Sequence, residues 1–270
     1  MIKKINEVQI RKIFYDEASF KLIKPPYIPL DNSEGDSTWF EFLPILNFVQ
    51  ENRLSESGFY GFFSPRFEEK TGFSPEFTHR TVQENFDKDA VLFSPGWDQL
   101  CFYQNPWEQG EQHHPGIVKA TQEFLDYAKI SIDIRTVVST RSTAVFSNFI
   151  VAKATYWKKW ARLASKFHQY CSDMSNGLDR VNTNHRGDAM PLRIFIQERL
   201  PSLVLADNTL KTAFAESSKS ILWPGSEEKL RRCDVVKASI QKNGLQTQLL
   251  EEYSALRLSI LRDIHLKTNS

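Results

Sequence analysis

The hydrophobic and polar positions of this chain follow two periods, and their order predicts strands that alternate with helices. Short apolar runs rich in Phe, Ile and Val are typical of strands. These runs occupy residues 8–15, 58–63, 90–93 and 144–152. Helical periodicity is found at residues 38–52, 74–86, 117–129, 155–170, 191–205, 210–214, 226–243 and 245–264. Residues 104–116 and 171–189 are polar and are predicted to be long loops.

Alternation of strands and helices predicts an α/β fold made of packed layers. We expect one layered domain at residues 1–207, with a helical extension at residues 208–270 packed on it. The strands at residues 58–63 and 90–93 both end at a Ser-Pro pair, which favours neighbouring strands whose loops meet at one edge of the sheet. Ligands of open α/β sheets collect at the carboxyl ends of strands, so this edge is the expected place for a site.

The other elements are organised around residues 31–65. A polar loop at residues 31–37 leads into a helix, and the pair Thr38 and Glu41 has the spacing of a capping box. The following strand ends at Ser64, with Arg66 two residues on. An acidic loop before a helix amino terminus is a place for sugar hydroxyls or a diphosphate. The alternative is an ordinary strand–helix unit with a capped helix and no ligand.

Composition excludes several classes of protein. A formal net charge of +1 gives no electrostatic basis for binding nucleic acid. A hydrophobic content of 41% allows a sizeable core, yet the sequence has no run of about 20 apolar residues that would span a membrane. The first ten residues lack the apolar segment of a signal peptide, and the three cysteines have no metal-ligand spacing. We therefore expect a cytoplasmic protein.

Candidate metal ligands are few. Asp87 and Asp89 form a D-x-D pair, but they precede a strand and are interpreted as a solvated charge run. Asp98 follows that strand and is better placed, although no second carboxylate lies two residues away. His113 and His114 lack a partner at metal-ligand spacing and are interpreted as a flexible surface pair. A divalent cation, Mg²⁺ or Mn²⁺, thus has Asp98 as its single candidate ligand.

Three polar residues, at positions 197–199, interrupt the apolar helix LRIFIQERLPSLVL. Buried charges need partners or a functional role. One interpretation is a structural ion pair between Glu198 and Arg199 that ties the helix to the sheet. The other is that Glu198 is a general base, because a carboxylate in a partly apolar cleft has a raised proton affinity and can take a proton from a hydroxyl.

Four segments of the chain resemble a family of bacterial glycosyltransferase-like proteins of polysaccharide assembly, with a Rossmann-like GT-A fold. The segments are residues 31–67, AVLFSP at 90–95, SNFIVAKATYWKKW at 147–160 and LRIFIQERL at 192–200. Their order and spacing agree with the family over roughly the first 205 residues. The resemblance implies transfer of a sugar from a nucleotide-activated donor to a hydroxyl of a surface polysaccharide or a lipid-linked glycan, as in capsule or lipopolysaccharide synthesis.

The resemblance also implies roles for individual residues. Glu198 would be the catalytic base, and Arg199 would orient it or neutralise the leaving phosphate. The donor-binding residues would be Asp31, Asn32, Glu34, Asp36, Ser64, Arg66, Ser94 and Asp98. The acceptor-binding residues would be Asn148 and Lys153. The carboxyl-terminal helices could contact a partner protein or the inner face of the membrane.

The chain differs from the family pattern at two places. The histidine-tyrosine-arginine-arginine run of the family is replaced by residues 62–66, in which only Arg66 is basic, and no D-x-D follows the strand at residues 90–93. These differences keep a second hypothesis open, in which the protein is an inactive GT-A-like module that binds a glycan or a partner within an assembly complex.

Overall fold

The computed structural model describes residues 7–268 except positions 174, 186, 218 and 220, so residues 1–6 of the amino-terminal stretch lie outside it. The strands are β1 (Val8–Phe14), β2 (Ile28–Asp31), β3 (Phe59–Phe63), β4 (Ala90–Leu92), β5 (Ile150–Lys153), β6 (Asn182–His185), β7 (Asp188–Pro191) and β8 (Thr212–Phe214). The α-helices are α1 (Glu17–Phe20), α2 (Phe42–Glu51), α3 (Phe67–Thr71), α4 (Pro75–Glu84), α5 (Trp97–Phe102), α6 (Pro106–His113), α7 (Ile117–Tyr127), α8 (Ala154–Ser172), α9 (Leu192–Gln197), α10 (Leu200–Leu205), α11 (Glu227–Asn243) and α12 (Thr247–Thr268). Two 3₁₀ turns, η1 (Ser37–Trp39) and η2 (Leu178–Arg180), complete the described elements.

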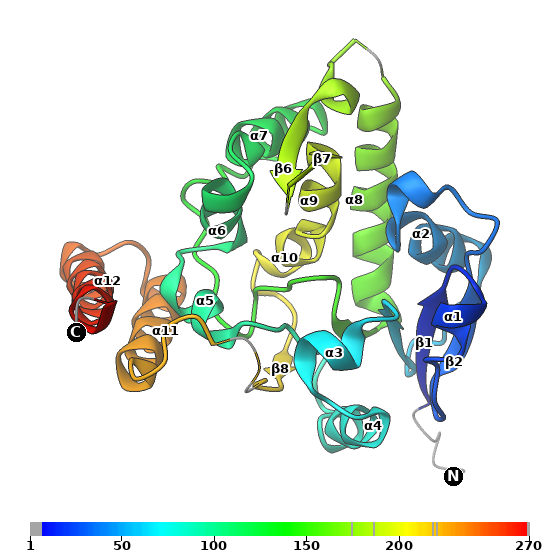
Figure 1. The fold of residues 1–270 in the computed structure, drawn as a ribbon, viewed down its shortest axis with the longest axis horizontal. Coiled ribbons are helices and arrows are strands. Elements are labelled where there is room, and N and C mark those ends of the chain that lie inside the picture. The colour runs from blue at the N-terminus through cyan, green and yellow to red at the C-terminus, as the bar shows by residue number, and fades with distance from the viewer. Residues whose placement is uncertain (1–6, 174, 186, 218, 220, 269–270) are drawn as a thin grey trace.

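Six strands form one mostly parallel sheet in the order β2-β1-β3-β5-β4-β8. Strand β5 runs antiparallel to β3 and to β4, and the other pairs of this sheet are parallel. The predicted α/β class is therefore confirmed, and the sheet is compatible with a Rossmann-like fold. Figure 1 shows β1 and β2 toward one end of the molecule and α11 and α12 at the other.

The sheet corrects two predictions. The two strands that end at Ser-Pro, β3 and β4, are not neighbours, because β5 lies between them. Residues 210–214 are not helical, since residues 212–214 form the edge strand β8 beside β4. A five-residue stretch is too short for its period to separate a strand from a helix. The sheet thus includes residues on both sides of position 207, and the carboxyl-terminal helical part begins with α11.

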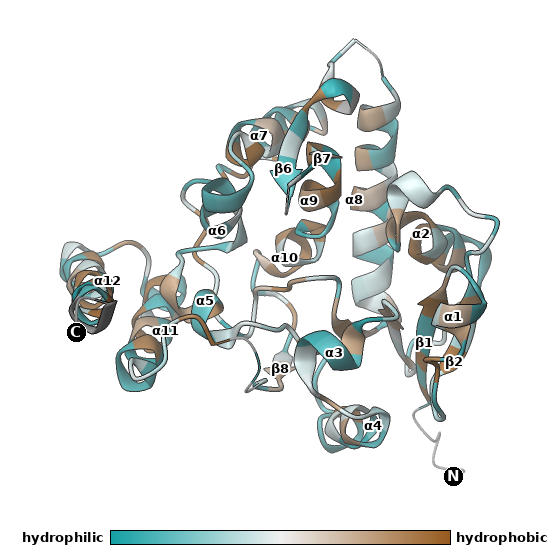
Figure 2. Ribbon diagram, in the orientation of Figure 1, coloured by the Kyte–Doolittle hydropathy of each residue, from teal (hydrophilic) through white to brown (hydrophobic). Residues whose placement is uncertain are grey.

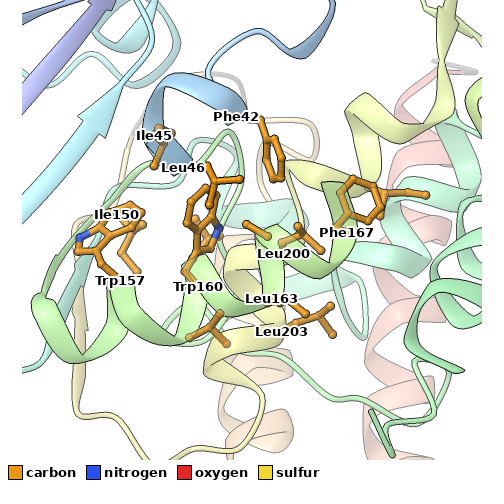
Figure 3. Close-up of a cluster of buried hydrophobic side chains, with 14 of the residues drawn as sticks. Phe42, Ile45, Leu46, Ile150, Trp157, Trp160, Leu163, Phe167, Leu200 and Leu203 are labelled. Atoms are coloured by element: carbon orange, nitrogen blue, oxygen red, sulfur yellow. The ribbon is translucent and has the colours of Figure 1, made fainter. Parts of the chain in front are cut away.

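Alternate residues of the central strands pack on opposite faces of the sheet, as the period of two requires. In β3, Tyr60 and Phe62 belong to the larger core cluster, whereas Phe59 and Phe63 belong to a smaller cluster on the other face. Helices α2, α8 and α10 cover the face of the sheet that carries the larger cluster. Figure 3 shows their side chains meeting, and among those it labels are Phe42, Ile45, Leu46, Trp157, Trp160, Leu163, Phe167, Leu200 and Leu203.

The two predicted loops contain regular structure. Residues 104–116 include α6, which begins with Asn105 as its N-cap and Pro106 in its first turn, a helix start that the sequence analysis missed. Residues 171–189 include the hairpin of β6 and β7. The strand expected at residues 144–152 is restricted to β5, because Ser147 and Asn148 have φ values of 58° and 57° and cannot continue a strand.

The predicted carboxyl-terminal helices are confirmed as α11 and α12, which pack with α5 in a third apolar cluster. The buried ammonium of Lys237 donates a hydrogen bond to Tyr103 O, 2.7 Å away, and the Tyr253 hydroxyl donates to Phe102 O at 2.6 Å. These bonds fix both helices to the end of α5. None of the described helices is both long enough and apolar enough to span a bilayer.

Candidate functional site

Four loops leave the central sheet at one edge and surround the candidate site. The parallel strands β1, β3 and β4 are followed there by Tyr15, by residues 64–66 and by residues 94–96. Strand β5 is antiparallel, so Ser147 and Asn148, which precede it, reach the same edge. The prediction that both Ser-Pro turns lie at one edge is confirmed. This is the edge at which open α/β sheets bind ligands.

A cavity of about 390 Å³ lies at this edge of the sheet. Small-molecule sites have volumes of roughly 300–1,000 Å³, so the cavity is large enough for a small-molecule ligand. It is lined by Arg66, Lys70, Pro95, Gly96, Gln99, Gln109, His114, Phe146, Ser147, His185, Phe195, Glu198 and Arg199. The lining combines three cationic side chains, one carboxylate and two imidazoles.

Arg199 is a buried cation whose guanidinium bonds to neutral acceptors. Its Nε donates to Pro106 O at 2.8 Å, and its two terminal nitrogens donate to Phe195 O and to Gln109 Oε1, each at 2.7 Å. The residue is 5% exposed. Burial lowers the pKa of Arg199 to about 10, against the opposing charge of Glu198. Arg199 therefore presents a fixed positive charge, and none of the carboxylates that the structure describes is hydrogen-bonded to it.

Lys70 is the second cation of the cavity that lacks a bound carboxylate. Its Nζ donates to Ser147 Oγ, 3.3 Å away, and lies 5.6 Å from the centre of the Phe149 ring. Within the described part of the chain, no carboxylate forms an ion pair with Lys70. Arg66 differs, because its Nε donates to Glu69 Oε2 at 2.8 Å in an exposed pair. Lys70 is thus the more available of the two for a ligand.

Glu198 lies between α9 and α10, at the end of a helix that is apolar along most of its length (Figure 2). Helix α9 is tied to the turn before α2 by two hydrogen bonds. Arg193 donates to Thr38 Oγ1 at 3.0 Å, and Gln197 Nε2 donates to Trp39 O at 3.1 Å. Among the described residues Glu198 forms no ion pair within 4.0 Å with Arg199, so the structural ion pair considered above is not formed.

The predicted capping box of Thr38 and Glu41 is not formed. Asp36, not Thr38, caps the turn, with its Oδ1 accepting from Thr38 N at 2.9 Å, and Glu41 makes no side-chain cap to α2. Burial raises the pKa of Glu41, and the charge of Glu198 raises it further, while Lys70 lowers it. Glu41 therefore does not cap α2 with its side chain, and it is not among the residues that line the cavity.

Two imidazoles and a phenyl ring form one wall. His114 stacks on Phe195 with ring centres 3.5 Å apart, and the ring centres of His185 and His114 are 5.7 Å apart. Burial lowers the pKa of His114 to about 4, and the charges of Arg199, His185 and His113 lower it as well. His114 is therefore neutral at pH 7. It is 6% exposed, so the prediction of a flexible surface histidine is wrong for this residue.

The structure brings some predicted residues together. Glu198, Arg199 and Arg66 line one cavity. Ser64, Ser94 and Asn148 lie at the same edge of the sheet and are buried. Ser94 Oγ accepts from Phe146 N at 3.0 Å, whereas Ser64 Oγ and Asn148 Oδ1 are buried without a hydrogen-bond partner in the described structure. Unpaired buried polar atoms of this kind are costly, which marks the edge as a place where a ligand or water would be bound.

The four predicted residues of the acidic loop do not line the cavity. Asp31 accepts a hydrogen bond from Ser33 N at 2.8 Å, Asn32 donates to Phe40 O at 3.4 Å, Asp36 caps the turn, and Glu34 is exposed. Three of these side chains therefore hold the loop in shape.

Two further predicted residues lie away from the cavity. Lys153 ends β5 at the opposite edge of the sheet and pairs with Asp89 at 3.2 Å, so the structure does not bring it to the cavity with the other predicted residues. The same pair gives Asp89 a structural role, in place of the solvated charge run that was expected for the D-x-D pair. Asp98 is fully buried, and its Oδ2 accepts from Trp223 N at 3.2 Å and from Leu222 N.

Asp98 does not fit a metal site, because one of its oxygens is taken by two backbone amides. Across the residues that the structure describes, no group of three or more histidine, cysteine, aspartate or glutamate side chains could hold a metal ion. The Mg²⁺ or Mn²⁺ considered above thus has no fitting set of ligands at Asp98.

Several residues of the site were missed, and some had a signal in the sequence. Lys70 follows Arg66 by one helical turn, so a helix after Ser64 and Pro65 would have placed both on one face. His114 precedes Pro115 and Gly116, which end α6. His185 had no such signal, since its place depends on its contact with His114, which is distant in the sequence.

The candidate site combines one carboxylate, three cations and a set of uncharged hydrogen-bonding groups at the carboxyl edge of the sheet. Compared with protein-family models, with curated proteins and with solved structures, the chain has no match.

Proposed function

We propose that the protein is a glycosyltransferase that moves a sugar from a nucleotide-activated donor to a hydroxyl of a surface polysaccharide or of a lipid-linked glycan. The observation that supports this most is the cavity shared by Glu198, Arg199 and Lys70. Two cations without bound carboxylates suit the two negative charges of a diphosphate, and the carboxylate between helices suits a general base.

The proposed reaction uses each of these groups once. Glu198 takes the proton of the acceptor hydroxyl as the acceptor oxygen forms a bond to the anomeric carbon of the sugar. The bond between that carbon and the phosphate oxygen breaks, and its electron pair leaves with the diphosphate. Arg199 and Lys70 stabilise the negative charge that develops on the leaving diphosphate. Electrostatic stabilisation of this kind is usually the largest single contribution that an enzyme makes to the reaction rate.

The fold is compatible with this proposal, and we further propose that it is of the GT-A type. A mostly parallel sheet with a cavity at its carboxyl edge is a usual frame for nucleotide ligands. The neutral wall of His114, His185 and Phe195 would contact the sugar or the base, because flat rings pack on both.

The test is a thermal-shift screen against UDP-, GDP- and CMP-sugars, followed by a transfer assay with Glu198→Gln. A donor that binds should raise the melting temperature by ligand linkage. Glu198→Gln should lower turnover by about 10²–10⁴-fold while donor binding persists, because only proton transfer is lost. The matched control is Glu84→Gln, the same substitution at an exposed position of α4.

A fully active Glu198→Gln protein would remove the base assignment. Donor binding without turnover in the unaltered protein would favour the second hypothesis, an inactive module that binds a glycan or a partner. No thermal shift with any nucleotide sugar would contradict the proposed donor site.

A further inference from the structure

Three side chains of the cavity lining form a chain of hydrogen bonds. A terminal nitrogen of Arg199 donates to Gln109 Oε1 at 2.7 Å, and Gln109 Nε2 donates to Gln99 Oε1 at 3.1 Å. All three residues line the cavity, although they come from separate parts of the fold: Gln99 belongs to α5, Gln109 to α6, and Arg199 precedes α10. The buried guanidinium is thereby connected to the amide of Gln99.

The direction of this chain is fixed by its first member. A guanidinium has N–H donors and no acceptor, so the Gln109 atom that faces Arg199 must be the amide oxygen. The amide nitrogen of Gln109 then faces Gln99, whose oxygen must accept. The group that remains is Gln99 Nε2, a donor with no acceptor among the residues that the structure describes. The orientation of both amides therefore follows from the chemistry of Arg199.

Gly96 leaves room for this free donor. A Cβ atom on Gly96 would lie 3.1 Å from Gln99 Nε2, closer than nearly all Cβ contacts. Gly96 also has a φ of 65°, in the left-handed region that favours glycine. It lines the cavity and is the N-cap of α5, in the turn after β4. The Gln99 amide nitrogen thus lies beside the turn at the carboxyl edge of the sheet.

Lys70 has the same effect on a second neutral group. An ammonium has donors only, so Ser147 Oγ accepts from Lys70 Nζ, 3.3 Å away. A hydroxyl that accepts a bond keeps its own hydrogen, and in the described part of the chain the Ser147 hydroxyl has no acceptor for it. Ser147 lines the cavity, where its φ of 58° holds it at the start of the segment leading into β5. Each of the two cations therefore leaves a neutral neighbour with a free donor.

These free donors favour one class of ligand. The oxygens of an ionised diphosphate accept hydrogen bonds and do not donate them, so they match the Gln99 amide and the Ser147 hydroxyl. A sugar hydroxyl can also accept, but its hydrogen then needs an acceptor of its own, and Glu198 is the single carboxylate of the lining. Hydrogen bonds to an ionised acceptor are also about twice as strong as those between neutral groups.

We propose that Gln99 and Ser147 are specificity-determining residues of this cavity, which bind the oxygens of a diphosphate through donors whose direction Arg199 and Lys70 impose. That the diphosphate belongs to a nucleotide sugar rests on the proposed function, whereas the direction of the hydrogen bonds does not. Gln109 acts through Gln99 and is a positioning residue.

Isothermal titration calorimetry with inorganic pyrophosphate at about pH 7.5 tests the proposal. Gln99→Met keeps the size of the side chain without its donor and should weaken binding about tenfold, because one hydrogen bond to a charged ligand is lost. Ser147→Ala should weaken binding by about three- to tenfold for the same reason. Gln112→Met is the matched control, the same substitution at an exposed position of α6, and it should bind as the unaltered protein does.

Gln109→Glu reverses the direction of the chain and separates this role from a merely structural one. Both oxygens of the new carboxylate accept, so Gln99 must turn its nitrogen toward α6 and its oxygen toward the cavity. In this background Gln99→Met should strengthen pyrophosphate binding by about two- to threefold, because an oxygen that repels the anion is removed. A Gln99 that only supported the structure would lower the affinity by the same factor in both backgrounds.

An equal effect of Gln99→Met in the two backgrounds would overturn the proposal, and so would the absence of pyrophosphate binding to the unaltered protein. If thermal unfolding shows that Gln99→Met does not fold, Gln99→Ala replaces it in both backgrounds, since it removes the same donor and adds no bulk. The same reversal of sign is then expected, and its absence again contradicts the assigned direction.

The outcome also separates this inference from the proposed function. Pyrophosphate binding with the reversal of sign, but without transfer from any nucleotide sugar, would contradict the proposed function and leave this inference standing. Sugar transfer with equal effects in both backgrounds would do the opposite. The two failures are therefore distinguishable.

Discussion

A Cβ atom on Gly110 would lie 2.9 Å from Nε of Arg199 and 3.0 Å from its Cζ. Real Cβ atoms do not approach other atoms so closely, so only glycine leaves room for the guanidinium at this point of α6. The same guanidinium is held by Pro106 O and Gln109 Oε1, which also belong to α6. Helix α6 therefore serves as a support that positions the buried cation of the cavity.

Gly110→Ala is expected to displace Arg199 without unfolding the protein. Alanine is favoured over glycine in a helix by up to about 1 kcal/mol, which offsets part of the lost hydrogen bonding. Pyrophosphate affinity should fall by about three- to tenfold, roughly the effect of weakening one charge-assisted contact. Calorimetry with pyrophosphate measures this, and Gln112→Ala on the exposed side of α6 is the control. Equal affinity in both variants would show that Arg199 does not contact the anion.

The sequence predicted the fold where the hydrophobic pattern is long or the helix start is marked. Helix α4 begins where Ser74 and Pro75 predicted it, with Ser74 Oγ accepting from Phe77 N at 3.1 Å. Strands β3 and β4 were found because they are buried and apolar on both faces. Their neighbours could not be predicted, because the insertion of β5 between them depends on contacts that no local pattern encodes.

The neutral state of His114 should make stability depend on pH in a defined window. The pKa of His114 is about 4 in the folded protein because of burial and the nearby Arg199, against 6.5 for an ordinary histidine. Between these values the unfolded chain binds more protons than the folded one, so stability falls as the pH drops from 6.5 toward 4. The loss at about pH 4 should be on the order of 1–3 kcal/mol.

Urea unfolding at about pH 7, 5.5 and 4 measures this loss, with His114→Gln as the comparison. His79 is a half-buried histidine whose pKa is also lowered, but it titrates in both proteins and cancels in the difference. The two proteins should diverge only below about pH 6.5. A difference in the free energy of unfolding that is constant across this pH range would contradict the neutral state of His114.

The predicted site was right about its edge and incomplete in its members. Arg66 was found because it follows an apolar strand, and Glu198 was found because it interrupts an apolar helix; both line the cavity. Glu41 was assigned to a capping box, since Thr38 three residues earlier matches that pattern as well as any sequence can. The turn is capped by Asp36 instead, and Phe40 has a φ of 46°, and neither feature has a signature in the spacing of residues.

Asp98 should behave as a structural residue and not as a metal ligand. In Asp98→Ala the backbone amides of Leu222 and Trp223 lose their acceptor, which should cost about 1–3 kcal/mol of the free energy of unfolding. Asp98→Asn keeps an acceptor oxygen and should cost less. Thermal unfolding with and without Mn²⁺ checks the assignment, because the response to Mn²⁺ should be the same in Asp98→Asn and in the unaltered protein. A stabilisation by Mn²⁺ that Asp98→Asn abolishes would contradict this role.

Lys237 should make the stability of the protein depend on pH in the alkaline range as well. Its ammonium is fully buried, donates to Leu100 O and Tyr103 O, and joins α11 to the end of α5. Burial lowers the pKa of Lys237 to about 8, against the opposing charge of Asp234. Between pH 8 and the ordinary lysine value of 10.5 the unfolded chain binds more protons, so this residue favours the folded state increasingly as the pH rises through that window.

Lys237→Met isolates the effect. The free energy of unfolding of the unaltered protein should rise relative to that of Lys237→Met by about 2–3 kcal/mol across the window, and the difference should be flat below about pH 8. Comparison of the two proteins is necessary because the buried thiols of Cys101 and Cys233 have raised pKa values and destabilise both proteins at high pH. Urea unfolding at about pH 7.5, 9 and 10 measures the difference. A difference independent of pH would mean that the Lys237 ammonium keeps its proton throughout and holds the two helices together as a permanent charge.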